Sequence, residues 1–166
     1  HMPGHGRSMS DSHVELPVVT ASEDELEVDI APFRALHNAP MGMTAHVVYT
    51  AWDADRPASL SARVIGEIIR RRIGFDGFLM SDDLGMHALS GGFDDRARDV
   101  VEAGCDAALH CSGDMAEMVA VASALGEMSA EGRTRLERAM ASVAEAGEYV
   151  GYQELAAKRD ALLAYA

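Results

Sequence analysis

The sequence predicts an α/β fold in which parallel strands alternate with helices. Three apolar runs, over residues 43–49, 77–81 and 106–111, are each followed by a segment with the apolar spacing of a helix. This alternation is typical of right-handed βαβ units, whose strands form a parallel sheet. A doubly wound open sheet and a (β/α)8 barrel both fit the order. A complete barrel takes about 250 residues, so three strands in 166 residues would be less than a whole one.

The first third of the chain predicts one helix and one strand. The acidic segment "SEDELEVDIAPFRAL" follows an opening stretch rich in glycine and serine. Acids in the first turn favour a helix, but Pro32 interrupts the pattern, so the helix begins either at these acids or at Pro32. The β-branched and aromatic residues of "MGMTAHVVYTAWD" then predict a buried strand over residues 43–49.

The helices of the middle and the end of the chain carry clearer start and stop signals. In "SLSARVIGEIIRRRIGF" Ser61 is the expected N-cap and Gly74 the end. The apolar face of that helix consists of Val64, Ile65, Ile68 and Ile69. "DDRARDVVEAG" predicts a second helix, and Asp114 with Glu117 begins a third in a capping-box-like spacing. The apolar side of the third consists of Met115, Met118, Val119 and Ala122, and two more helices are expected over residues 130–147 and about 153–164.

Composition and charge narrow the class of protein. With 48% hydrophobic and 25% charged residues, the chain is typical of a globular protein with a core. It contains no apolar run of 18 residues and no signal-like start, so we expect no membrane span and a cytoplasmic location. The net charge of -13 argues against nucleic acid or an anionic membrane as a partner. Cys105 and Cys111 would lie about 20 Å apart on one strand, beyond the roughly 7 Å that a disulfide allows, so we expect free thiols.

Polar side chains stand where the predicted strands end, which is where α/β proteins carry functional residues. His46 lies in the first strand, Asp82 and Asp83 close the second, and residues 110–112 close the third. Asp83 or Ser112 alone is equally well explained as a turn residue. Asp82 is the stronger candidate, because it ends a strand that otherwise reads "GFLM".

The opening loop contains Asp11 and His13, two residues apart. On an extended loop their side chains point the same way, so the carboxylate can orient the imidazole and make it a better proton carrier near neutral pH. A surface turn is the alternative interpretation. Since the chain lacks zinc spacings, a Walker motif and GxSxG, we expect no metal and no cofactor.

Four segments occur together in a recognisable order: "HMPGHGRSMSDSHVELPVV", "MTAHVVYTAWD", "PASLSARVIGEIIRRRIGFDGFLMSDDLGMHAL" and "AGCDAALHC". In order and spacing they resemble the C-terminal half of the barrel in the bacterial β-N-acetylglucosaminidases of glycoside hydrolase family 3. The resemblance implies half of a TIM (β/α)8 barrel with extra C-terminal helices. It divides this single partial domain into a family-like catalytic half at residues 1–112 and a helical tail at 113–166.

The same resemblance implies roles for five residues. Asp82 matches the family's nucleophile, and His13 matches its general acid/base, oriented by Asp11. His1 matches the histidine of a lysine–histidine pair that holds sugar hydroxyls, and His46 lies in the strand that faces the substrate. "HM" is also the form of a cloning scar, but "PGHG" continues the family pattern, so we take His1 as native.

The implied reaction is retaining hydrolysis of terminal β-linked N-acetylglucosamine through a glycosyl-enzyme intermediate. The implied substrates are N-acetylglucosaminyl-anhydro-muramyl peptides, processed in the cytoplasm during peptidoglycan recycling. A histidine acid/base repels an anionic acceptor less than a carboxylate would, which leaves transfer to phosphate open.

Two alternatives remain: a truncated, non-catalytic sugar-binding fragment, and a β-glucosidase of the same family. A half barrel exposes strand edges. We therefore expect weak stability and little activity unless the chain is part of a longer product or self-associates through those edges.

Overall fold

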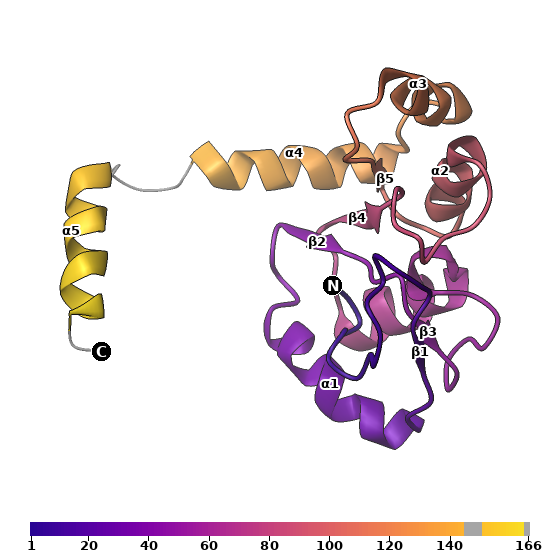
Figure 1. The fold of residues 1–166 in the computed structure, drawn as a ribbon, viewed down its shortest axis with the longest axis horizontal. Helices are drawn as coiled ribbons and strands as arrows, with labels where there is room; N and C mark the ends of the chain where they lie inside the picture. Colours follow the sequence, from indigo (N-terminus) through magenta and orange to yellow (C-terminus); the bar gives the residue numbers. More distant parts are fainter. Residues whose placement is uncertain (145–150, 165–166) are drawn as a thin grey trace.

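The computed structural model describes residues 1–144 and 151–164, and it confirms the α/β class. Helices surround two small sheets whose strands pair in parallel, and the N-terminus lies beside β2 (Figure 1). The two-stranded sheet consists of β1 (Val18–Val19) and β3 (Val48–Tyr49). The three-stranded sheet has the order β2 (Met41–Met43), β4 (Phe78–Asp83) and β5 (Ala107–Leu109).

The N-terminal residues extend the three-stranded sheet beyond β2. Met2 forms a parallel bridge with Thr44: the Met2 amide donates to the Met43 carbonyl at 2.8 Å, and the Ala45 amide donates to the Met2 carbonyl at 2.8 Å. At the other side of the sheet, β5 pairs with β4 and has no second strand partner among the described residues. The sheet is therefore open at β5, as expected of part of a barrel.

The predicted strand over residues 43–49 is wrong as a single element. The structure divides it into β2 and β3, which belong to different sheets, and β1 pairs with β3 without having been predicted. The division follows from a change of partner. The Thr44 amide still donates to Met80 of β4, whereas the Val48 amide donates to Pro17 in the other sheet.

Helix α1 (Glu23–Ala35) begins at the acidic segment and runs through Pro32. Ser22 and Glu25 form a capping box, which satisfies free amides at the helix start. Pro32 removes one helical hydrogen bond, to the carbonyl of Val28, whose side chain is exposed. Because the loss falls on the solvent side near the end of a well-capped helix, the alternative start at Pro32 is wrong.

The helix that the sequence predicts most sharply is η2 (Val64–Ile73), a π-helix preceded by the 3-10 turn η1 (Ala58–Leu60). The Ser61 hydroxyl accepts the Val64 amide at 3.1 Å, and Gly74 ends the helix with a left-handed φ of 82°. All four residues of the predicted apolar face are buried: Val64, Ile65, Ile68 and Ile69. These residues belong to the hydrophobic core, together with Leu79 of β4.

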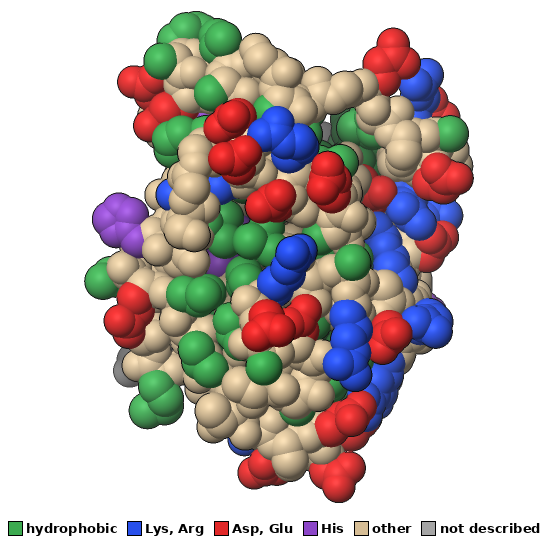
Figure 2. Space-filling model, turned by 90° about the vertical axis from the view of Figure 1, so that its right-hand side faces the viewer, with side chains coloured by type: hydrophobic (Ala, Val, Ile, Leu, Met, Phe, Trp, Pro, Cys, Tyr) green, Lys and Arg blue, Asp and Glu red, His purple; other side chains and the backbone are tan. Residues whose placement is uncertain are grey.

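Four more helices follow: α2 (Phe93–Glu102), α3 (Met115–Ala124), α4 (Ala130–Ala144) and α5 (Tyr152–Leu163). Asp114 caps α3 as predicted, but the apolar side of α3 is open, with Met115, Met118 and Val119 all exposed. Hydrophobic side chains reach the surface between acidic ones on the face in Figure 2. The predicted helix end at 145–147 lies outside the described residues.

Two expectations about the chain's surroundings can be compared with the structure. Cys105 and Cys111 are both free, which confirms the expectation of unpaired thiols. Within the part of the chain that the structure describes, no helix is long and apolar enough to cross a membrane.

Candidate active site

The candidate site is built on the C-terminal end of β4, where Asp82 lies with 8% of its surface exposed. One carboxylate oxygen, Oδ1, accepts the Asp83 amide at 2.9 Å. The other, Oδ2, lies 3.3 Å from Nε2 of His1. Asp82 is thus held by its own strand on one side and faces a histidine on the other.

His1 reaches this position because Met2 joins the sheet beside β2. The bridge to Thr44 fixes the main chain, and the His1 side chain, 46% exposed, projects over the same end of the sheet as Asp82. Two residues far apart in the sequence, which the resemblance had assigned to the same sugar, are therefore neighbours in space.

The loop that carries Asp11 and His13 is anchored at its centre by a buried serine. Ser12 is 4% exposed; its hydroxyl lies 3.1 Å from Nε2 of His5, and its carbonyl accepts the Ala88 amide at 3.2 Å. Ala88 belongs to the segment that follows β4. The loop is consequently tied to the same strand end that carries the candidate nucleophile.

Asp11 and His13 form the predicted pair. Oδ1 of Asp11 lies 2.8 Å from Nδ1 of His13 and also accepts the His13 amide at 2.9 Å. Both side chains are exposed. This pair and the His1–Asp82 pair make no hydrogen bond to each other within the described residues. In this structure the two halves of the proposed chemistry lie at the same strand end without direct contact.

Charge couples the two pairs. The hydrogen bond that His13 donates to Asp11 and the negative charge of Asp11 raise the pKa of His13, and the charges of Asp82 and Asp83 raise it further. In return, the His13 amide and imidazole lower the pKa of Asp11. The exposed imidazole thus keeps its proton to a higher pH than a free histidine would, which suits a proton donor.

His46 occupies a different environment from that of the other candidates. It is fully buried, with Nδ1 2.6 Å from the Ser59 hydroxyl and Nε2 3.1 Å from the Asp83 carbonyl. Both ring nitrogens therefore have protein partners. This placement beneath the strand ends argues for a role other than the sugar contact expected from the sequence.

A second polar cluster closes the end of β5. Nε2 of His110 lies 2.9 Å from Oε2 of Glu117 and 2.9 Å from the Ser112 hydroxyl, and Nδ1 lies 3.8 Å from Asp83 Oδ1. Asp83 Oδ1 also accepts the Cys111 amide at 3.0 Å. The sequence predicted functional residues at these strand ends, but it gave no indication that the Asp83 side chain would bond to the segment that follows β5.

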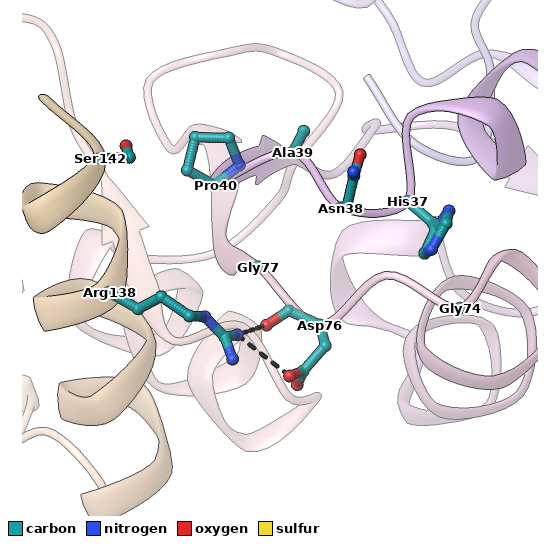
Figure 3. Close-up of a pocket in the computed structure, with 9 residues that line it drawn as sticks. All are labelled: His37, Asn38, Ala39, Pro40, Gly74, Asp76, Gly77, Arg138 and Ser142. Carbon is teal, nitrogen blue, oxygen red and sulfur yellow. Dashed lines mark hydrogen bonds and ion pairs between the residues drawn. The ribbon is translucent and has the colours of Figure 1, made fainter. Parts of the chain in front are cut away.

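A hollow of about 390 Å³ lies at the opposite end of the sheet (Figure 3). It is bounded by the segments that precede β2 and β4 and by α4, whose Arg138 pairs with Asp76. In barrels this end serves stability, whereas chemistry sits at the carboxyl ends of the strands. The hollow is therefore not the candidate active site.

The side chains at these strand ends do not form a metal centre. Among the residues that the structure describes, no group of three or more His, Cys, Asp or Glu side chains is arranged to hold a metal ion.

An aspartate at the end of a parallel strand and a histidine–aspartate pair on the adjoining loop are the kinds of group that nucleophilic and acid/base chemistry in barrels uses. The profile of the family described as "Glycosyl hydrolase family 3 N terminal domain" matches residues 1–146. The chain therefore belongs to glycoside hydrolase family 3.

Individual relatives agree. The chain is 46% identical over 117 residues to a beta-hexosaminidase of Alkalilimnicola ehrlichii, covering 68% of this chain and 33% of that protein. It superposes on a family 3 β-N-acetylglucosaminidase of Paenibacillus sp. with a TM-score of 0.75 at 34% identity, covering 91% of this chain and 32% of the other. For NagZ of Neisseria gonorrhoeae in complex with N-trifluoroacetyl-D-glucosamine, the TM-score is 0.69 at 35% identity, with 95% and 44% covered. The chain thus spans 32 to 44% of the length of these three proteins.

Proposed function

We propose that the whole protein that carries this chain is a retaining glycoside hydrolase that removes terminal β-linked N-acetylglucosamine. The observation that carries this proposal is the placement of Asp82, at the end of β4 against His1, with the Asp11–His13 pair tied to the same strand end through Ser12. The family membership and the names of the relatives support N-acetylglucosamine as the sugar that is removed.

The proposed reaction has two steps. In the first, an Asp82 oxygen attacks the anomeric carbon while His13 gives its proton to the departing glycosidic oxygen, which leaves a glycosyl ester on Asp82. In the second, His13 takes a proton from water, and the water oxygen displaces the carboxylate at the same carbon. Two displacements restore the β configuration. His1 contacts sugar hydroxyls beside Asp82.

We further propose that the natural substrates are cell-wall fragments, N-acetylglucosaminyl-anhydro-muramyl peptides, processed in the cytoplasm. The two free cysteines support a reducing compartment. The β-N-acetylglucosaminidase and beta-hexosaminidase relatives support the terminal sugar rather than the remainder of the fragment.

The test is release of p-nitrophenol from its β-N-acetylglucosaminide by the whole protein. Asp82→Asn keeps the shape of the side chain but removes the nucleophilic charge, so the rate should fall about 10³-fold or more. Asp94→Asn, at an exposed position in the first turn of α2, is the matched control and should retain the wild-type rate. A wild-type rate in Asp82→Asn, or a faster rate on the aryl β-glucoside than on the aryl N-acetylglucosaminide, would contradict the proposal.

The open edge of the sheet supports a second candidate. Because β5 has a single strand partner among the described residues, the 166-residue chain by itself is expected to bind saccharide without turnover. Full activity would then need β5 to be covered by more of the same polypeptide or by a second copy. Calorimetric titration with N-acetylglucosamine and light scattering of the chain alone separate these cases.

A further inference from the structure

The reaction proposed above gives no role to one buried histidine. His46 has no exposed surface, lies beneath the carboxyl ends of the strands, and uses both nitrogens in hydrogen bonds. A buried polar side chain that is fully bonded fixes the groups it bonds to, because breaking either bond leaves a polar atom unsatisfied. The role of His46 therefore depends on what its two partners hold in turn.

The hydrogen bonds determine the form of the imidazole. The Asp83 carbonyl only accepts, so Nε2 of His46 must carry a proton. In a neutral ring Nδ1 then holds a lone pair, and the Ser59 hydroxyl donates to it. Burial lowers the pKa of His46, and the charge of Arg96 lowers it further. The hydrogen bond to Asp83 and the charges of Asp82 and Asp83 act in the opposite direction and only partly offset the burial. The Asp83 carbonyl therefore selects the tautomer protonated on Nε2, and the Ser59 hydroxyl satisfies the remaining nitrogen.

Asp83 transmits this constraint to its neighbour. Its amide donates to Oδ1 of Asp82 at 2.9 Å, while its carbonyl is held by His46 at 3.1 Å. Its own carboxylate accepts the Gly85 and Cys111 amides at 3.1 and 3.0 Å. The residue that fixes one oxygen of Asp82 is thus itself fixed at its carbonyl and its side chain. The remaining oxygen, Oδ2, is the one that faces His1.

We propose that His46 is a positioning residue that, through the main chain of Asp83, fixes the Asp82 carboxylate with Oδ2 aimed at the anomeric carbon. This inference rests on the proposed function and adds to it. It replaces the direct sugar contact expected for His46. It also gives the buried Ser59 a role beside the ring, since its hydroxyl bonds Nδ1 and so holds the imidazole in place.

The kinetic test compares variants of the whole protein on two aryl N-acetylglucosaminides, with p-nitrophenol and 2,4-dinitrophenol as leaving groups. A misaimed nucleophile slows attack whatever the leaving group, whereas loss of the acid matters less when the leaving group needs little protonation. His46→Phe should lower kcat about 10- to 100-fold on both substrates with KM within about threefold. His13→Ala should lose much less on the dinitrophenyl substrate than on the other.

Conservative replacement tests the hydrogen bonds themselves. In His46→Gln the side-chain amide can donate to the Asp83 carbonyl and its oxygen can accept from Ser59, so most of kcat should return. Ser59→Ala, a smaller change that serves if His46→Phe does not fold, should lower kcat several-fold with KM unchanged. His37→Gln, at an exposed position just beyond the end of α1, is the matched histidine control and should behave as wild type.

Four results would overturn the inference. A raised KM with unchanged kcat in His46→Phe would indicate a sugar contact. The same conclusion would follow if His46→Gln had a raised KM and failed to restore kcat. Wild-type kcat in Ser59→Ala would show that the bond to Nδ1 does not help to hold the imidazole. Nitrogen NMR of the wild-type protein that showed the proton of His46 on Nδ1 would contradict the hydrogen bond to the Asp83 carbonyl without any assay. Absence of turnover in the wild type, by contrast, would count against the proposed function, while the NMR result would still decide the tautomer.

Discussion

Asp11 and His13 show how two exposed residues acquire a defined chemistry. Their hydrogen bond has a length of 2.8 Å, and the buried Ser12 between them holds the loop in place. Because Asp11 is the largest cause of the raised pKa of His13, it sets the pH range over which the imidazole can act as an acid.

Asp11→Asn should therefore shift the pH dependence of kcat/KM in a known direction. A general acid works only while it is protonated, so activity falls as the pH rises through the pKa of His13. Removing the negative charge lowers that pKa, and the alkaline limb should move to lower pH. Asp94→Asn leaves the limb in place. An alkaline limb that did not move in Asp11→Asn would show that Asp11 does not tune the acid.

Individual residues could be predicted from the sequence only where a motif reports them. Asp82, His13, Asp11 and His1 stand in segments whose order matches the family, and the structure places them at one strand end. The contacts of His46 could not be predicted, because its partners Ser59 and Asp83 lie 13 and 37 residues away in the chain. Such pairings depend on the folded arrangement of strands and leave no local signal.

At the scale of elements, Asp106 joins η2, β4 and α4 at the start of β5. Its carboxylate, 4% exposed, accepts Arg70 Nη2, Arg135 Nη1 and the Leu79 amide, each at 2.9 Å. Two arginines and a main-chain donor thus depend on one buried charge. This is the polar joint between the sheet and the helices that cover it.

Asp106→Ala should lower the free energy of unfolding by about 3–5 kcal/mol, since it leaves the partly buried Arg70 without its carboxylate partner and Arg135 with the exposed Asp76 alone. Denaturant unfolding of the whole chain measures this loss. Asp76→Ala is the matched control, because Asp76 pairs with Arg135 and Arg138 but is 70% exposed. Its loss should cost less than about 1 kcal/mol. Equal costs for the two variants would contradict the role given to Asp106.

Helices whose start and stop residues can be read from the sequence were predicted well. Strands whose bounds depend on which other strand they pair with were not. Around η2 the Ser61 hydroxyl accepts the Val64 amide, the expected apolar face is buried, and Gly74 ends the helix. The apolar run at 43–49 gave no sign that it would divide between two sheets, because only the pairing of Thr44 with Met80 and of Val48 with Pro17 separates its ends. Burial preference is local, but strand pairing is not.

At the scale of the whole molecule, the division into a catalytic half at 1–112 and a tail at 113–166 remains a prediction. The tail itself is not uniform. Helix α4 buries Ala139 and supplies Arg135 to Asp106, whereas α5 has no buried residue. In Figure 1, α4 leaves the body of the molecule and α5 follows beyond its far end. Stability should therefore depend on α4 and not on α5.

Two shortened chains test this difference. A chain ending at residue 144 should have a free energy of unfolding within about 0.5 kcal/mol of the full chain's, since α5 contains no buried residue. A chain ending at residue 112 should lose about 3 kcal/mol or more, because Asp106 is deprived of Arg135. Equal stability of the two shortened chains would show that the tail is dispensable throughout.

The proposed chemistry depends above all on Asp82 being the nucleophile of a retaining hexosaminidase. The most direct measurement is mass spectrometry of the whole protein after reaction with a fluorinated N-acetylglucosaminyl donor that forms the ester quickly and loses it slowly. We predict a mass increase of one glycosyl group, carried by the peptide that contains Asp82 and lost in Asp82→Asn. An adduct on Asp83, or turnover of the donor with inversion and no adduct, would contradict this role of Asp82.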